Sequence, residues 1–427
     1  MATRQDQRSC PGGPGGGSAG QGSGAELPTR PVTETESLSE LLEDSLPSFG
    51  AAYLRRLWTL LDEAIGKGLP LTLSVSGPVT ASGQHYTWLN PLLDTGWFCL
   101  VSTTDAVCYH DGHRALDGAK ERPFFRVDRH GDDGELRDDR TIRVTDVGFP
   151  EDTLLEQDLF LRTILGLPEF QRSMSGTEFR ALLGQRFAEQ ESRSGAAEGL
   201  LALCWRKAIP IFVGAPADGS VFLNSVARWT LREAFGDAYG FELDLHREVF
   251  ESCAFHRWAV RDLEVGAIGA LILGGGVPKN FNLQPEPALS QILGLEDVEG
   301  YLYDIQITTA PVTDGSLSSC PPAEAVTWGK VDKDAYQRTT ESMPADYSMV
   351  MPILTKALLD KRDRLARLRG ELGEETLLQR HPEAHGYLRD DAGYRLFDER
   401  DRLVGALRDE VRARRDELRA STEYDLA

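Results

Sequence analysis

The stretch AIGALILGGGV, residues 267–277, runs from a short apolar segment directly into three glycines. Glycines in such a place let the backbone approach a phosphate group and leave amide donors free to bind it. The stretch does not match the GxGxxG pattern, because Lys279 stands where the third glycine would be, and it is not a Walker loop. Taken alone, it fits a tight strand exit as well as a dinucleotide site.

The same rhythm, a short apolar run that ends in small or polar residues, recurs along the chain, with helix-like segments such as SVARWTLREAFGD between the runs. This alternation predicts an α/β fold: one large Rossmann-like domain whose mainly parallel sheet has helices on both faces. The other runs are LPLTLSVSG (69–77), WFCLVSTTD (97–105), IPIFVGAPADGS (209–220) and YDIQITTAPVTDGS (303–316).

Ligands of such sheets bind beyond the carboxyl ends of the strands, so these small and polar residues are expected to converge on one crevice. DGS at 218–220 and TDGS at 313–316 offer acids that could hold ribose hydroxyls or an ammonium group. Asp-Gly-Ser is also ordinary turn chemistry, and only its repetition at two strand ends favours a site.

The two ends of the chain differ from its middle in composition. Residues 1–35 are rich in Gly, Ser and Pro and are expected to form a disordered tail before a catalytic domain at 36–360. Residues 361–427 are expected to be a charged helical extension. Its segment FDERDRLVGALRDEVRARRDELRAS places Leu403, Leu407, Val411 and Leu418 on one stripe, which could cover the domain or contact another subunit.

Charge and cysteine usage exclude several classes of protein. Lys and Arg number 46 against 67 Asp and Glu, a net charge of −21, which argues against nucleic acid as a partner and suits cationic ones. The six cysteines form no CxxC pair, which is typical of a reduced, cytoplasmic protein. No apolar segment is long enough to span a bilayer, so no membrane partner is expected.

The segment CYHDGHR supplies His110, Asp111 and His113. Two histidines at this spacing can share a helix face, but two fall short of a zinc site. No metal is therefore expected, and a hydrogen-bonded pocket histidine is the favoured interpretation.

The segment EAVTWGKVD, residues 324–332, sets Glu324 and Trp328 close to Lys330. A lysine becomes a nucleophile when a low dielectric lowers its pKa, and an indole both lowers the dielectric and attracts cations. The alternative is a surface turn with a snorkelling lysine. From these residues alone, a surface lysine is the favoured interpretation.

The longer segment DGSLSSCPPAEAVTWGK resembles the catalytic stretch of the deoxyhypusine synthase family, and LILGGGVPKN resembles the glycine-rich segment just upstream of it. SVSGPVTASG, LVSTTDAVCYHD and IPIFVGAPADGS are similar to further signature stretches of that family, in the same order. The resemblance extends from about residue 45 to 360 and leaves out the tail and the C-terminal extension.

This resemblance implies a homotetramer with active sites between paired subunits, and NAD as the cofactor. It implies that NAD takes a hydride beside the secondary amine of a polyamine such as spermidine, after which a lysine captures the aminobutyl group as an imine. The group then passes to an acceptor amine and the hydride is returned. The acceptor is a protein lysine in deoxyhypusine synthase and putrescine in the related homospermidine synthases.

Carried over by motif, Lys330 is the imine-forming lysine, Trp328 a pocket wall and Glu324 an amine-binding acid. Lys279 is the next lysine to consider. The segments that contact NAD contain Thr103, Thr104, Asp218, Gly275, Gly276, Thr309, Ala310, Asp314 and Gly315.

The chain departs from the family pattern in the amine pocket. Asn280 replaces a histidine, Leu223 and Leu317 replace two aspartates, and His110 with Asp111 stands where the family has an acidic pair. The altered pocket favours a small polyamine as acceptor, of the homospermidine synthase type. The alternatives are a true deoxyhypusine synthase acting on a protein lysine and a non-catalytic NAD-binding scaffold.

Overall fold

A central sheet of six parallel strands organises the protein, in a computed structural model that describes residues 27–116, 124–390 and 392–422. The order across the sheet is β11-β10-β9-β1-β2-β7, which is the doubly wound order of dinucleotide-binding folds. The strands are β1 (Leu71–Val75), β2 (Phe98–Thr103), β7 (Ile211–Val213), β9 (Gly269–Leu273), β10 (Tyr303–Thr308) and β11 (Thr340–Pro344). The α/β class and the parallel sheet predicted from the apolar runs are confirmed.

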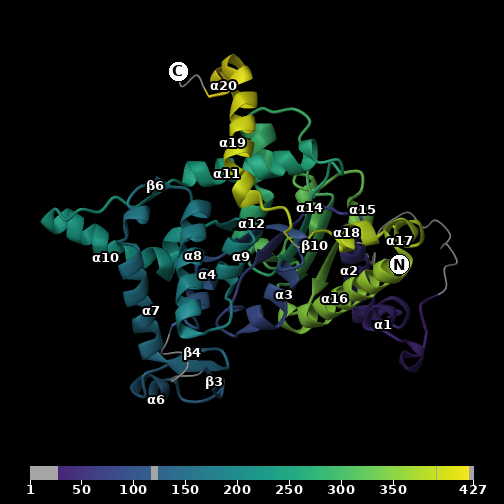
Figure 1. Cartoon of the computed structure of the whole chain (residues 1–427), viewed down its shortest axis with the longest axis horizontal. Coiled ribbons are helices and arrows are strands. Elements are labelled where there is room, and N and C mark those ends of the chain that lie inside the picture. Colours follow the sequence, from purple (N-terminus) through teal and green to yellow (C-terminus); the bar gives the residue numbers. More distant parts are fainter. Residues whose placement is uncertain (1–26, 117–123, 391, 423–427) are drawn as a thin grey trace, which may run out of the picture.

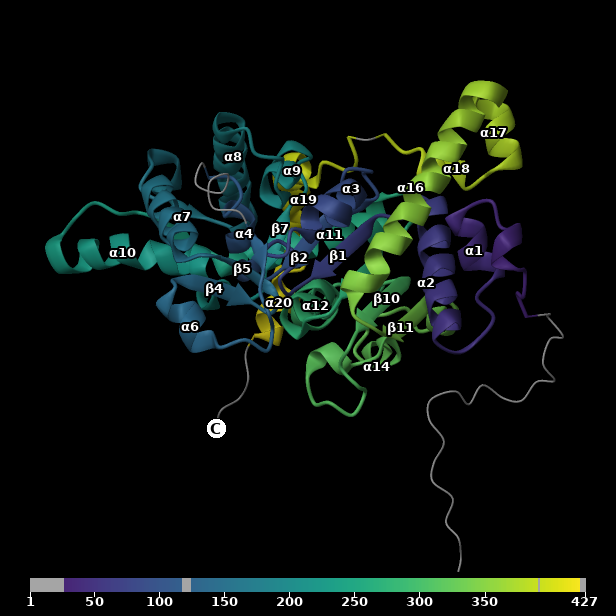
Figure 2. The same ribbon diagram turned by 90° about the horizontal axis from the view of Figure 1, so that it is seen from below.

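The five strands from β10 to β7 are buried on both faces between two layers of helices (Figures 1 and 2), whereas the edge strand β11 is only partly buried. One hydrophobic cluster joins Leu73 and Leu271 of the sheet to α2 (Phe49–Gly66), α3 (Asn90–Leu93), α4 (Asp105–Gly112) and α16 (Tyr347–Leu372). The other joins Leu100 and Ile272 to α11 (Leu245–Arg257), α12 (Gly276–Leu283) and α19 (Leu396–Ala413). Successive side chains of a strand point to opposite faces, so β2, β7 and β9 each contribute to both clusters.

The other elements extend from this core. A small antiparallel sheet of β3 (Phe125–Arg126), β5 (Val147–Pro150) and β4 (Thr141–Val144) carries the exposed α6 (Asp133–Asp138). The pair β6 (Ser173–Met174) and β8 (Glu242–Leu243) is short. The remaining helices are α1 (Leu38–Asp44), α7 (Glu151–Ile164), α8 (Gly176–Ser194), α9 (Leu200–Arg206), α10 (Ser220–Phe235), α13 (Pro285–Pro287), α14 (Pro322–Val326), α15 (Tyr336–Thr339), α17 (Glu374–Arg380), α18 (Ala384–Tyr387) and α20 (Arg415–Ser421).

The two ends of the described chain pack on the domain. Residues 1–26 of the expected tail lie outside the described residues, and from Leu27 onward the chain is described. Arg30, which lies within the range 1–35 that was expected to be disordered, forms an ion pair with Glu40 of α1 at 3.0 Å. The C-terminal stripe covers the domain, because Leu403 and Leu407 of α19 lie in the cluster built around α11.

Candidate functional site

The strand order reverses between β1 and β9, and this reversal locates a crevice at the carboxyl edge of the sheet. β1 runs on to Ser76 and Gly77, while the neighbouring β9 runs into Gly274, Gly275 and Gly276. In doubly wound sheets the ligand crevice opens at this switch point. The glycine-rich stretch thus lies where the fold predicts a cofactor.

The backbone of this loop demands glycine. Gly274 and Gly275 have φ values of 64° and 66°, which disfavour side chains. A Cβ on Gly275 would lie only 1.9 Å from Oγ of Ser76. Gly276 begins α12, whose first turn has no side-chain cap, so amide donors remain at the crevice. The loop therefore fits a phosphate-bearing cofactor.

The other residues proposed for the cofactor stand on neighbouring loops of the same edge. Thr103 ends β2 and donates its hydroxyl to the carbonyl of Val75 at 2.7 Å, which ties β2 to β1. Thr104 precedes α4, and the exposed Asp218 follows β7. Thr309, Ala310, Asp314 and Gly315 lie in the loop after β10, with Asp314 and Gly315 exposed.

A cavity of about 1200 Å³ opens beside this edge, between α11, α12 and α14. Four residues predicted from the sequence for the amine site line it together, Asn280, Glu324, Trp328 and Lys330, and Gly276 of the glycine-rich loop borders it. The Nζ of Lys330 donates to Oδ1 of Asn280 at 3.3 Å and lies 5.9 Å from the centroid of the Trp328 ring. The lysine and the indole therefore line one cavity, from a turn in which the Trp328 side chain is 59% exposed.

The backbone around Lys330 is fixed from both sides. Its amide donates to the carbonyl of Ala325 at 3.1 Å, and its own carbonyl accepts from Tyr301 at 2.9 Å. Gly329 has a φ of 76°, and a Cβ there would lie 2.5 Å from Oε2 of Glu286. The glycine thus makes room for a carboxylate directly beside the lysine.

Burial and charge both act on the Lys330 amine. Burial lowers its pKa and the nearby Lys279 lowers it further, while Cys320 and Glu286 act in the opposite direction. A lowered pKa increases the fraction of neutral amine, which is the nucleophilic form. The environment therefore favours lysine nucleophilicity.

A buried polar layer lies beneath the cavity. The Nζ of Lys279 donates to Oε1 of Gln306 at 2.6 Å and also to the carbonyl of Cys320. Burial lowers the pKa of Lys279, against the attraction of Asp304. Asp304 is fully buried, and burial raises its pKa to about 6 although Lys279 acts against this. Lys279 is thus held in place near Lys330 by two acceptor oxygens.

His110 and Asp111, which were expected to bind the amine, lie on α4 and do not line the Lys330 cavity. The two carboxylate oxygens of Asp111 accept the backbone amides of Leu200 and Leu201, each at 2.8 Å, so this side chain caps the start of α9. Burial raises the pKa of Asp111 to about 6 and lowers that of His110. Within one chain, the structure does not bring this pair to the other amine-binding residues.

Two carboxylates line the cavity within the described part of the chain. Glu248 is paired with Arg180 at 2.6 Å, which leaves the exposed Glu324 as the acid open to a ligand. Leu317 contributes an apolar wall, while Leu223 lies exposed on α10 and outside the lining. The cavity thus has largely apolar walls and one carboxylate, that of Glu324, which is accessible to a cationic ligand.

Sequence reasoning missed Glu286 and Asp304. Glu286 stands in PEPALS, which offers no local signal, and only the fold brings its carboxylate to Gly329. Asp304 sits inside a buried strand, and a charge in such a run is a signal that could have been noticed. In the described ranges no group of three His, Cys, Asp or Glu residues could hold a metal ion.

The switch-point crevice and the adjoining lysine cavity define a doubly wound α/β protein equipped for amine chemistry. A family model described as deoxyhypusine synthase matches residues 40–358. The chain therefore belongs to the deoxyhypusine synthase family, and this membership implies a transferase. The family match ends within α16, so most of the C-terminal extension lies beyond it.

Named relatives agree with the family match. A "Deoxyhypusine synthase-like protein" from a Cyanothece species is 36% identical over 339 residues, covering 78% of this chain and 81% of the relative. A protein of the same name from Thermosynechococcus vestitus is 36% identical over 354 residues, covering 81% and 85%. A "Probable deoxyhypusine synthase 2" from Methanosarcina mazei is 30% identical over 344 residues, covering 78% and 90%.

In the part of the chain that the structure describes, no helix is both long enough and apolar enough to cross a membrane.

Proposed function

We propose that this protein is an NAD-dependent aminobutyl transferase, which moves the group from a polyamine donor through an imine on Lys330 to an acceptor amine, preferably a small polyamine. The observation that carries the proposal is the position of Lys330. Its amine lies in a cavity, with Asn280 at 3.3 Å, an indole at 5.9 Å and a pKa lowered by burial. These are the conditions under which a lysine forms an imine.

The chain's own residues would hold NAD at the switch-point crevice. The uncapped start of α12, with Gly275 and Gly276, suits the pyrophosphate, and Thr104, Asp218 and Asp314 on adjoining loops suit the sugar hydroxyls. NAD would supply the acceptor, and later the donor, of a hydride. Lys330 would bind the aminobutyl group between these two events, and the walls around Trp328 would exclude water from it.

The shape and charge of the cavity support a small acceptor. A volume of about 1200 Å³ is at the upper end of small-ligand sites, which leaves room for a donor chain and a second small amine. Apolar walls suit methylene chains, and Glu324 can pair with one ammonium end. The net charge of −21 would draw polyamine cations towards the protein.

We further propose a cytoplasmic homotetramer, as the family resemblance implies. Apolar side chains on α7 and α10, which lie side by side, support subunit contacts (Figures 1 and 2). Leu159 is 63% exposed and Phe235 is 77% exposed. Apolar patches of this kind mark interaction surfaces. Residues such as His110 would then face an active site only across a subunit boundary.

The test is incubation of the full-length protein with NAD and spermidine, with putrescine or a lysine-containing acceptor protein as the second amine, followed by mass spectrometry. We expect homospermidine and diaminopropane, and a Lys330 adduct after borohydride reduction. Transfer to the protein lysine alone would replace the proposed acceptor with that of deoxyhypusine synthase. NAD binding without any product or adduct would refute the enzyme and favour a scaffold.

A further inference from the structure

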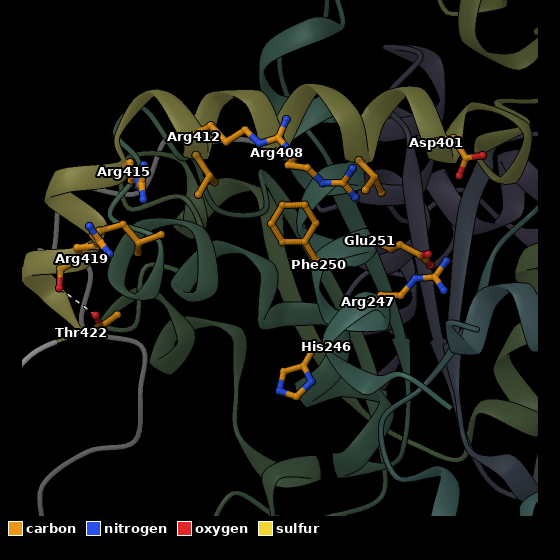
Figure 3. Close-up of a pocket in the computed structure, with 13 residues that line it drawn as sticks. His246, Arg247, Phe250, Glu251, Asp401, Arg408, Arg412, Arg415, Arg419 and Thr422 are labelled. Atoms are coloured by element: carbon orange, nitrogen blue, oxygen red, sulfur yellow. Dashed lines mark hydrogen bonds between the residues drawn. The ribbon is translucent and has the colours of Figure 1, made fainter. Parts of the chain in front are cut away.

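A second hollow, of about 850 Å³, lies between α11 and the C-terminal helices α19 and α20 (Figure 3). Phe250 of α11 faces the gap, and Val404 and Val411 of α19 complete an apolar floor. Arginines surround this floor; they are Arg247, Arg408, Arg412, Arg415 and Arg419. We call this hollow the arginine groove. Five positively charged side chains thus cluster in this groove, although the net charge of the chain is −21.

Three arginines of the groove, Arg408, Arg415 and Arg419, differ from their neighbours on the same helices. Arg395, Arg402 and Arg414 point elsewhere, and each pairs with an acid three residues further along or back, at 2.6 to 2.7 Å. The side chains of Arg408, Arg415 and Arg419, by contrast, make no ion pair or hydrogen bond with any residue that the structure describes.

Spacing adds to this contrast. Arg408 and Arg412 are one turn apart on α19, and Arg415 and Arg419 are one turn apart on α20, so each pair shares one side of its helix, and like charges at such spacing repel. Of the four, Arg412 alone has a described partner, Asp409 at 3.2 Å. An unpaired row of guanidinium groups is the arrangement that binds phosphate or carboxylate through paired donors.

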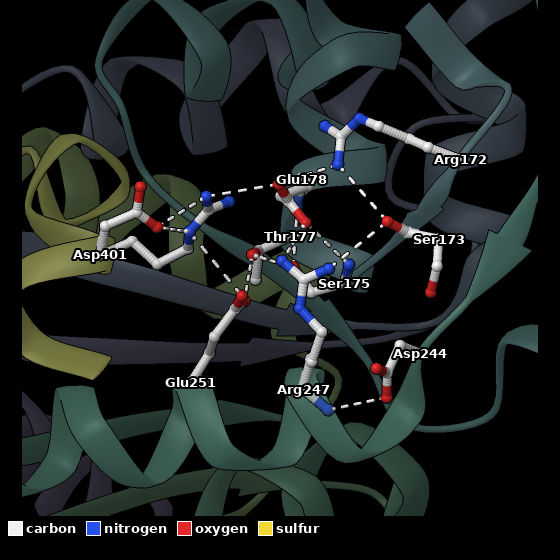
Figure 4. A network of polar contacts seen from close by, with 10 residues as sticks. Arg172, Ser173, Ser175, Thr177, Glu178, Asp244, Arg247, Glu251 and Asp401 are labelled. Carbon is white, nitrogen blue, oxygen red and sulfur yellow. Dashed lines mark hydrogen bonds and ion pairs between the residues drawn. The ribbon is translucent and has the colours of Figure 1, made fainter. Parts of the chain in front are cut away.

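The walls of the groove are held in place before any ligand arrives. Glu178, Arg247 and Glu251 form a polar network at one end (Figure 4), where Arg247 lies 2.8 Å from Glu178. Arg400 of α19 reaches Glu178 at 3.3 Å, and Arg257 of α11 pairs with Glu410 at 2.6 Å. These contacts fix α19, with Arg408 and Arg412, against α8 and α11, while α20, with Arg415 and Arg419, packs against α19.

The apolar floor narrows the chemistry of the ligand. A bare inorganic anion would occupy the arginines and leave Phe250, Val404 and Val411 in water. A volume of about 850 Å³ matches one small molecule, for which such sites usually combine apolar walls with a few charged groups. The ligand should therefore carry an anionic head on an apolar body.

We infer that the arginine groove is a binding site for a small amphiphilic anion, with a phosphate or carboxylate head at Arg408 and Arg415 and an apolar body on Phe250. Most of its walls come from α19 and α20, which lie beyond residues 40–358 that match the family. α11 separates the groove from the Lys330 cavity, because Val249 and Ser252 line the cavity while Phe250 lines the groove. The site is thus distinct from the transferase site.

Calorimetric titration of the full-length protein tests this inference with four probes: n-octyl phosphate, n-butyl phosphate, inorganic phosphate and n-octanol. We expect octyl phosphate to bind once per chain, and each other probe about tenfold more weakly or worse, because head and tail both contribute. Arg408→Gln and Arg415→Gln should weaken octyl phosphate about tenfold. Arg402→Gln, an equal charge change on the same helix as Arg408, should leave binding unchanged.

Three outcomes would overturn the inference. Equal affinity of all four proteins for octyl phosphate would place its binding elsewhere. Inorganic phosphate as tight as octyl phosphate would show a simple anion site. If no probe binds but Arg408→Gln changes the sedimentation of the protein, the groove is instead a contact between copies of this chain.

Discussion

The amine of Lys330 donates a hydrogen bond to the side-chain oxygen of Asn280 across 3.3 Å. A neutral amine can keep this bond and still direct its lone pair into the cavity, because it has hydrogens to spare. Asn280 thereby orients the lysine without adding a charge that would hold its proton. The residue in which this chain departs from the family pattern thus contacts the proposed nucleophile directly.

Lys330→Arg should abolish the borohydride-trapped adduct and the aminobutyl transfer, since a guanidinium stays protonated and cannot attack. NADH formation from the donor should persist, because that step does not require the lysine. The two readouts are adduct mass and absorbance at the NADH band. Full transfer by this variant would assign the nucleophile elsewhere, with Lys279 as the next residue to change.

Trp328→Ala should raise the KM for the donor and divert the imine to water, giving free aminoaldehyde in place of transferred product. The indole stands 5.9 Å from the lysine amine and is 59% exposed within one chain; in the proposed site it would attract the cationic donor and limit the approach of water to the imine. The ratio of aldehyde to product measures this diversion. Trp205→Ala, at an exposed tryptophan outside the cavity, is the matched control and should leave the ratio unchanged.

The sheet, and the carboxyl edge at which its loops gather, could be predicted because both follow from patterns within short stretches of sequence. A run such as ALIL is apolar enough to be buried on both faces, and a parallel sheet gathers the loops that follow its strands. The apolar residues of α2 recur at helical spacing in the same way, and Leu57, Leu60, Leu61 and Ile65 are all buried. The burial of a strand or of one helix face follows from the spacing of apolar residues within that segment, and it can be predicted without knowing which distant segment packs against it.

Partners distant in sequence were not predictable in this way. Nothing local to Asp111 indicates that its carboxylate caps α9, about ninety residues later. Likewise the stripe on α19 indicated an apolar face but not its partner α11, which the tertiary fold supplies. The same limit explains why Glu286, which approaches Lys330 from another element, was missed.

Leu407→Ala should lower the free energy of unfolding by about 2–5 kcal/mol, the usual cost of a large-to-small change in a packed core. Leu407 is 1% exposed and packs in the cluster between α19 and the body of the domain. Urea unfolding of the full chain measures the change. Arg402→Ala on the exposed side of the same helix should cost almost nothing. A neutral Leu407→Ala would mean that the extension detaches in solution.

The last prediction concerns the pH dependence of adduct formation. Lys330 reacts as the neutral amine, so trapping should rise with pH through its pKa, which burial and the charge of Lys279 hold below 10.5. Lys279→Gln removes that charge, which raises the pKa of Lys330 and moves the profile to higher pH. The buried Asp304, whose pKa is about 6 beside Lys279, should then bind a proton more readily instead of remaining an unpaired charge. Lys279→Arg keeps the charge and should restore the original profile, whereas a merely structural role would leave the midpoint unmoved in both variants.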